Sequence, residues 1–134
     1  MYLFDTDIVS HVLKKRRTAA LMARLEATPR AAQFTSAVNV AEIFFGVLRK
    51  EGRKDLLRCY EDDVFPRLTI LPFDRASARI FGQIKADLER RGLTRFEPDL
   101  QIASIALAHN LTLVTGNVRH YSGIPGLRVE NWLL

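Results

Sequence analysis

The sequence predicts an α/β protein with a central parallel β-sheet that is flanked by helices on both faces. Short apolar runs alternate with longer segments of helical periodicity, which is typical of parallel strands joined by crossover helices. Polar residues follow two of the apolar runs, at the carboxyl ends of strands where open α/β sheets bind ligands. The length of 134 residues suits one domain with a real core, so we expect a single domain over residues 1–134.

The predicted strands and helices follow one another with short connections. We expect strands at 2–5, 33–35, 68–71, 111–114 and 127–130, and helices at about 7–14, 18–28, 37–50, 53–64, 74–91 and 98–109. The helix at 37–50 is the best supported, because apolar residues recur in it at helical spacing. This stripe consists of Val38, Ala41, Phe45 and Leu48.

Glycine, proline and asparagine mark several of the boundaries. Gly52 and Gly92 follow predicted helices, where a left-handed residue commonly ends the helix. Pro98 suits the first turn of the helix at 98–109, and Asn110 suits its exit. Pro72 limits the third strand to a short run of the kind found at a sheet edge.

Composition indicates a soluble globular protein without a membrane segment. Hydrophobic residues make up 48% of the chain and charged residues 26%, and no apolar stretch approaches the length of a membrane span. The amino terminus runs into a strand and an acidic motif, so a signal peptide is not expected. Cys59 is the one cysteine, which favours a reducing, cytoplasmic setting.

The charge balance points to a polyanionic partner. The formal net charge is +5, with 20 Lys and Arg against 15 Asp and Glu. A basic surface fits nucleic acid and an ordinary solvated surface about equally well. Acidic residues at the predicted centre favour nucleic acid, because a phosphodiester needs a metal at the reacting phosphate and cations along its flanks. The basic clusters are Lys14 to Arg17, Arg49 with Lys50, Arg53 with Lys54, Arg90 and Arg91 with Arg95, and Arg119 with His120.

Two carboxylates stand in segments that are otherwise apolar. Asp5 ends the first apolar run, and Asp99 shares a helical face with Ile102, Ala103 and Ala106. An ionised carboxylate on such a face is unfavourable unless a cation or hydrogen-bond donors compensate it. Each also has an ordinary interpretation, Asp5 as a helix N-cap and Asp99 as an acid in a first helical turn.

Glu42 and Asn117 complete a set of four candidate catalytic residues. Glu42 flanks the apolar stripe of its helix, although an exposed helical Glu is the commoner case, and Asn117 also suits a turn after Gly116. Three carboxylates from distant segments, without a neighbouring cation in the sequence, together indicate a bound metal ion. Oxygen ligands favour Mg²⁺ or Mn²⁺, whereas zinc prefers Cys or His, and the three histidines have no paired spacing.

Four motifs in a fixed order carry a family resemblance, with a fifth stretch at Asn117–Trp132. The four motifs are Leu3–Ser10, Thr35–Ile43, Asp99–Ala103 and Leu113–Asn117. With them the chain closely resembles a PIN-domain ribonuclease, and the nearest branch is the VapC toxins of bacterial and archaeal toxin–antitoxin pairs. The resemblance implies an endoribonuclease that uses Mg²⁺ or Mn²⁺, forms a homodimer and is inhibited by a VapB-like antitoxin.

The resemblance also implies roles for individual residues. Asp5, Glu42 and Asp99 would form the metal-binding acidic centre, and Asn117 would occupy a fourth, more variable polar position. The expected reaction is metal-assisted hydrolysis, with the ion held by Asp5 and Asp99. Glu42 would bind the ion directly or through water, or orient the attacking water.

We also expect Thr6, Thr115 and Asp7 to lie at or beside the site. Thr6 and Thr115 would add hydrogen bonds to the metal ligands, and basic side chains that remain unassigned would hold single-stranded or loop RNA. Asp7 replaces a frequent Asn of the family, and its position in a first helical turn suggests an interaction with the helix dipole.

Alternative classes match parts of the same pattern. A haloacid-dehalogenase-like phosphatase also begins with an apolar strand and two spaced acids, but it requires Gly-Thr where this chain has Ile8 and Val9. A phosphate-receiver signalling domain requires a lysine that is missing after Val114. A non-catalytic nucleic-acid-binding module explains the basic surface but gives no reason for Asp99.

Overall fold

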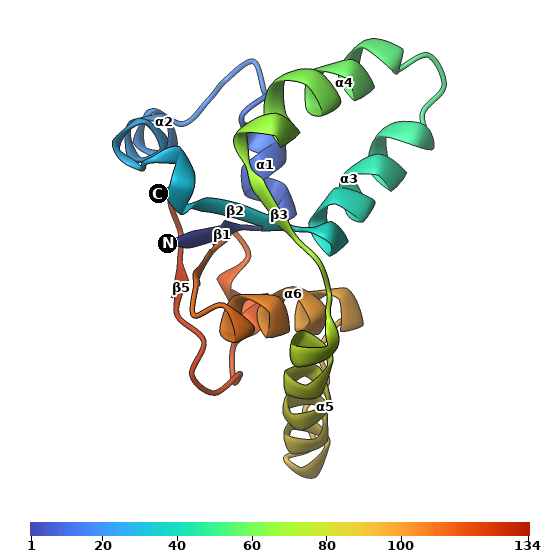
Figure 1. Cartoon of the computed structure of the whole chain (residues 1–134), viewed down its shortest axis with the longest axis vertical. Coiled ribbons are helices and arrows are strands. Elements are labelled where there is room, and N and C mark those ends of the chain that lie inside the picture. The colour runs from blue at the N-terminus through green and yellow to red at the C-terminus, as the bar shows by residue number, and fades with distance from the viewer.

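The computed structural model describes residues 1–134 and has the α/β architecture that the sequence predicts (Figure 1). Five parallel strands form one sheet in the order β3-β2-β1-β4-β5. The strands are β1 (Tyr2–Phe4), β2 (Gln33–Ser36), β3 (Thr69–Leu71), β4 (Thr112–Val114) and β5 (Val129–Glu130). The helices are α1 (Thr6–His11), α2 (Ala19–Ala27), α3 (Ala37–Leu48), α4 (Lys54–Arg58), α5 (Arg75–Arg90) and α6 (Glu97–Ala108).

Helical turns also occupy several connections. Wide π-helical turns at Cys59–Val64 (η2) continue α4, so the helix expected at 53–64 is present but changes its winding after Arg58. Shorter 3-10 turns lie at Arg30–Ala32 (η1), Phe65–Arg67 (η3) and Val118–Tyr121 (η4). The strands and helices otherwise fall within a few residues of their predicted bounds.

Most of the predicted boundary residues act as expected. Gly52, Gly92 and Asn110 all adopt positive φ, at 75°, 69° and 54°. Gly92 and Asn110 directly follow the C-cap residues of α5 and α6, whereas Gly52 lies in the turn between α3 and α4. The left-handed conformations of Gly92 and Asn110 allow the chain to leave α5 and α6. α3 ends earlier than predicted, at Leu48, so Gly52 does not terminate it. β3, which Pro72 follows, lies at one edge of the sheet, as predicted.

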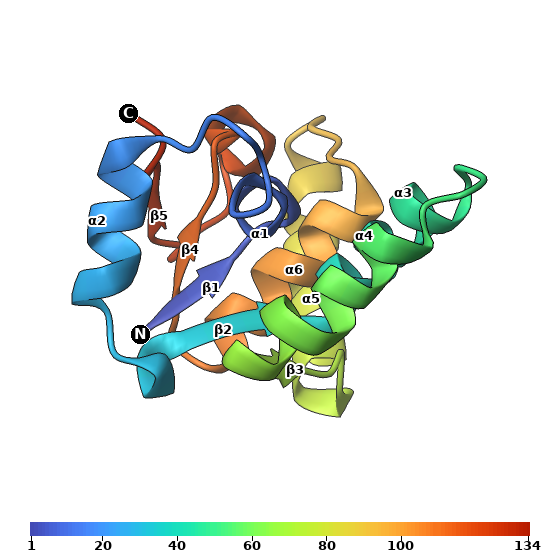
Figure 2. The ribbon, with the colours of Figure 1, turned by 90° about the horizontal axis from the view of Figure 1, so that it is seen from above.

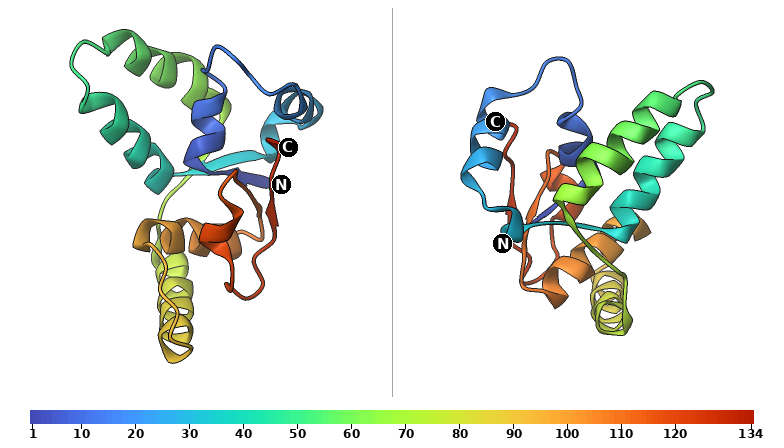
Figure 3. Two further views of the ribbon diagram at one scale, coloured as in Figure 1. Left: turned by 180° about the vertical axis from the view of Figure 1, so that it is seen from behind. Right: turned by 45° about the horizontal axis from the view of Figure 1, so that its top comes forward.

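Alternate residues of the strands enter two separate cores, one on each face of the sheet. Leu3 packs with α5 and α6, whereas the next residue, Phe4, packs with α1 to α4 and with Trp132. Figure 2 shows the sheet from above, and both views of Figure 3 show the two termini on the side of the sheet where β5 lies. No helix in the chain has the length and apolarity needed to cross a membrane.

The apolar stripe predicted for α3 is wrong. Phe45 and Leu48 are 66% and 65% exposed, whereas the helix buries Asn39, Ile43 and Val47. Almost every residue of α3 is apolar, so periodicity alone did not determine which side faces the core. The contacts of α3 with α1 and α4 decide it, and in Figure 1 the carboxyl-terminal half of α3 projects away from the sheet.

Candidate active site

The candidate residues gather at the carboxyl ends of the three central strands. β1 lies between β2 and β4, and the chain reverses its direction of travel across the sheet between β1 and β4. Such a switch point leaves a crevice in open α/β sheets, because the connections on its two sides diverge. Asp5 follows β1, Asn39 lies in the first turn after β2, and Thr115 follows β4.

Asp5 is buried at the centre of a set of hydrogen-bond donors. Its Oδ1 accepts from the Thr6 amide at 2.8 Å and from Asn39 Nδ2 at 3.0 Å. Its Oδ2 accepts from Thr115 Oγ1 at 2.8 Å and from the Tyr121 hydroxyl at 2.9 Å. Asp5 is therefore an N-cap of α1, and donors from three further segments also orient its carboxylate.

Glu42 reaches the site from α3 through Thr6. The Thr6 hydroxyl donates to Glu42 Oε1 at 2.7 Å and accepts from Asn39 Nδ2 at 3.0 Å. Partial burial raises the pKa of Glu42, the hydrogen bond from Thr6 opposes this rise, and the negative charge of Asp5 adds to it. Glu42 is thus held beside Asp5 rather than pointing into solvent.

Asp99 lies on the opposite side of the crevice, in the first turn of α6. It is 8% exposed, and Ile102, Ala103 and Ala106 on its face are completely buried, as predicted. Burial is the main cause that raises the pKa of Asp99 to about 6, and the negative charge of Asp5 adds to it. His120 Nδ1 lies 3.4 Å from Asp99 Oδ2.

Tyr121 joins the two aspartates. Its hydroxyl donates to Asp5, and it also lies 3.5 Å from Asp99 Oδ1. Burial, followed by the charges of Asp5 and Asp99, raises the pKa of Tyr121 above its usual value, so the hydroxyl keeps its proton. Nothing in the sequence singled out Tyr121, because its proximity to Asp5 arises only when η4 folds against α6.

Asn39 is the second residue that sequence analysis missed. It is completely buried, and with Ser36 it forms a capping box at the start of α3 while its amide reaches Asp5 and Thr6. A Ser followed three residues later by a polar residue ahead of an apolar helix is a recognisable signal. That pattern would have predicted the cap, although not the contact with Asp5.

Asp7 does more than interact with the helix dipole. Its Oδ2 accepts from the Gly116 amide at 2.8 Å and from Asn117 Nδ2 at 3.3 Å, so it fastens the turn after β4 to α1. Its Oδ1 is buried without a hydrogen-bond partner. Burial, and then the charge of Asp5, raises the pKa of Asp7. The expectation that Asp7 serves the dipole alone is therefore incomplete.

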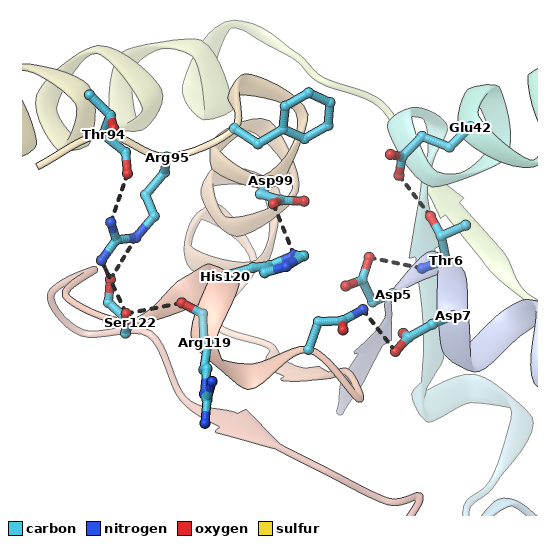
Figure 4. Close-up of a pocket in the computed structure, with 12 residues that line it drawn as sticks. Asp5, Thr6, Asp7, Glu42, Thr94, Arg95, Asp99, Arg119, His120 and Ser122 are labelled. Carbon is cyan, nitrogen blue, oxygen red and sulfur yellow. Dashed lines mark hydrogen bonds and ion pairs between the residues drawn. The ribbon is translucent and has the colours of Figure 1, made fainter.

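These side chains line one pocket with a volume of about 650 Å³ (Figure 4). Figure 4 shows Asp5, Asp7 and Glu42 on one side and Asp99 with His120 on the other. As placed, no three His, Cys, Asp or Glu side chains converge into a complete metal-ligand group. The lining consists of Asp5, Thr6, Asp7, Glu42, Thr94, Arg95, Phe96, Asp99, Asn117, Arg119, His120 and Ser122.

Comparison with known proteins gives the class of this fold and site. The PIN domain family matches residues 2–122. Ribonuclease VapC2 from Haemophilus influenzae is 35% identical over 132 residues, which cover 98% of each chain. The tRNA(fMet)-specific endonuclease VapC from Shigella flexneri is 30% identical over 131 residues, covering 98% of this chain and 97% of that protein. The chain therefore belongs to the PIN domain family.

Solved structures that resemble this chain indicate its branch within the PIN domain family. FitAcB from Neisseria gonorrhoeae has a TM-score of 0.89 at 28% identity, with 98% of both chains covered. VapBC2 from Rickettsia felis, bound to a DNA fragment from their promoter, has a TM-score of 0.87 at 30% identity, again with 98% of both chains covered. Together with the sequence relatives, they place the chain in the VapC branch of the family.

Proposed function

We propose that this protein is a metal-dependent endoribonuclease and the toxin of a VapBC-type toxin–antitoxin pair. One observation carries the proposal: Asp5, Glu42 and Asp99, from three distant segments, line a single pocket. Relatives named as ribonucleases and as a tRNA-specific endonuclease support RNA as the substrate. The net charge of +5 supports a polyanionic substrate as well.

The residues of the pocket suit a divalent cation. The donor set is made of carboxylate oxygens, which favour hard ions such as Mg²⁺ or Mn²⁺. The pKa values of Glu42 and Asp99 are raised by burial and by the charge of Asp5, so the folded protein gathers negative charge that a cation would neutralise. The three carboxylates line one pocket but do not converge as placed, so binding a cation requires their side chains to rotate toward one another.

Each residue contributes a separate part of the proposed mechanism. Asp5 and Asp99 would hold the ion from opposite sides of the pocket, and Glu42 would bind it or orient the attacking water. A divalent ion supplies Lewis acidity toward the scissile phosphodiester. Thr6 holds Glu42, and Thr115 holds Asp5, through the hydrogen bonds described above.

Asn117 has a positional role in this proposal. It is exposed at the pocket rim and reaches Asp7 with its amide, so its side chain can meet either the substrate or water. Its side chain is a neutral amide, whereas an Asp at this position would add a further negative charge to the pocket. We therefore assign Asn117 to substrate positioning rather than to metal binding.

An antitoxin partner follows from the same relatives. FitAcB and VapBC2 are names of toxin–antitoxin assemblies, and one curated relative is named Toxin FitB. We propose that a VapB-like protein binds and inhibits this chain, and that the chain forms a homodimer. Co-purification with the product of the adjacent reading frame, followed by light scattering, tests both parts.

Cleavage of RNA is the decisive experiment. The purified chain should cut single-stranded RNA internally with Mg²⁺ or Mn²⁺, and EDTA should abolish the cuts. Asp99→Asn should be inactive, whereas Glu97→Gln, which neutralises an exposed acid in the same helical turn, should be active. Equal cleavage in EDTA would refute the metal-dependent mechanism. Hydrolysis of a chromogenic phosphate monoester without RNA cleavage would support the phosphatase alternative instead.

A further inference from the structure

An exposed aromatic ring lies at the proposed catalytic pocket without a structural partner. Phe96 is 65% exposed and is the one hydrophobic residue among those that line the pocket. It belongs to neither hydrophobic core and makes no aromatic pair. The fold therefore gains little from this ring, although a large apolar side chain in water is unfavourable.

The backbone that carries the ring is firmly held. Arg95 donates to the Ser122 carbonyl from Nη2 at 2.7 Å and from Nε at 3.1 Å, which fastens this segment to the turn after η4. On the other side, the Phe96 carbonyl accepts from the Leu100 amide at 3.2 Å as α6 begins. The position of Phe96 is thus set by contacts on both sides of it, while its side chain remains available.

An arginine side chain without a hydrogen-bond or ion-pair partner lines the same pocket. The Arg119 side chain lines the pocket but makes no hydrogen bond or ion pair, whereas Arg95 uses its guanidinium to hold the neighbouring turn. Figure 4 shows Arg119 directed away from Asp99 and Asp5. An aromatic face, a free guanidinium and a group of acids therefore share one pocket.

We propose that Phe96 is a stacking platform for an unpaired base of the RNA substrate, next to the phosphodiester that is cut. Arg119 would contact a flanking phosphate. The inference rests on the proposed ribonuclease function and extends it, because stacking requires a base that is free of its duplex. The site would thereby select single-stranded or loop RNA over double-stranded RNA without reading a specific sequence.

Fluorescence of 2-aminopurine tests the stacking directly. The base analogue is placed in turn at each position of a short single-stranded RNA, and binding is measured in the Asp99→Asn background, which prevents cleavage. One position should be quenched. Phe96→Ala and Phe96→Leu should remove the quenching and weaken binding about 5- to 150-fold, the range given by loss of one base–aromatic stack. Phe96→Trp should retain both properties.

Phe45→Ala is the matched control, because this ring is 66% exposed but lies on α3 outside the pocket. It should leave quenching and affinity unchanged. Thermal melts should match for all Phe96 variants, since the ring belongs to neither core. A duplex of the same sequence should bind equally well with and without Phe96.

Three results would overturn the inference. The first is a Phe96→Ala variant that retains the quenching and the affinity, and the second is an equal loss with Phe45→Ala. The third is a Phe96→Ala variant that binds RNA normally but escapes inhibition by the antitoxin, which would make Phe96 a protein-docking residue. If the quenching depends on Phe96 but the wild-type chain cuts no RNA with Mg²⁺, the platform stands and the proposed nuclease function fails.

Discussion

Replacing Asp99 with Asn should stabilise the metal-free protein at neutral and higher pH. The pKa of Asp99 is about 6 in the folded chain against 3.8 for the free side chain, mainly because the carboxyl is buried. A difference of one in pKa between the folded and the unfolded chain corresponds to about 1.4 kcal/mol, so ionised Asp99 opposes folding by up to about 3 kcal/mol. This magnitude is an upper value, because a structure that relaxes around the charge reduces it.

The pH range of the effect follows from the sign of the shift. Well below the unfolded pKa of 3.8 the carboxyl is protonated in both the folded and the unfolded chain, so wild type and Asp99→Asn should have similar stability. As pH rises through about 6, the unfolded chain already carries the charge and the folded chain must accept it. Wild type therefore loses stability relative to the mutant as pH rises from 3.8 to about 6, and the difference levels off at higher pH.

Urea unfolding in EDTA at pH 4, 6 and 8 measures the difference in the free energy of unfolding. The advantage of Asp99→Asn should grow with pH, whereas Glu97→Gln, the exposed acid two residues away that pairs with Lys85, should bring no stabilisation at pH 8. Added Mg²⁺ should stabilise wild type more than Asp99→Asn, because binding to the folded state adds stability. A mutant that is less stable than wild type at pH 8 without metal would refute this reasoning and make Asp99 a structural part of the helix start.

Three further predictions concern the residues that support the site. Gly116→Ala should destabilise the fold by about 1–3 kcal/mol, because its Cβ would lie 2.6 Å from Asp7 Oδ2 and 2.7 Å from Leu133 Cδ1. The matched control Gly82→Ala, in open space on α5, should stabilise by about 0.5–1 kcal/mol in the same thermal melts. Tyr121→Phe should reduce cleavage and lower stability by about 1 kcal/mol through loss of the bond to Asp5, and unchanged activity would contradict its role in orienting that carboxylate. Asn39→Ala should lower stability by about 1–3 kcal/mol in urea, because it leaves buried partners unpaired, and a neutral effect would mean that water replaces the amide.

The sequence by itself determined the fold class and most of the element bounds. Apolar runs separated by helical segments predict a parallel sheet, and Gly92 and Asn110 end their helices through positive φ as expected. These features are local, because periodicity and turn chemistry act over a few residues. The unfavourable position of Asp99 was also readable, since its neighbours on the helical face are apolar whatever the rest of the chain does.

Only the tertiary structure decided which face of α3 is buried and which groups surround the acids. Phe45 and Leu48 looked like core residues, yet they are exposed, because the helices that contact α3 pack against its other side. Tyr121, Asn39 and the turn at Gly116 reach Asp5 or Asp7 across as many as 116 residues of sequence. Such contacts depend on strand order and on how the helices lie against the sheet, and neither is encoded in the spacing of any single segment.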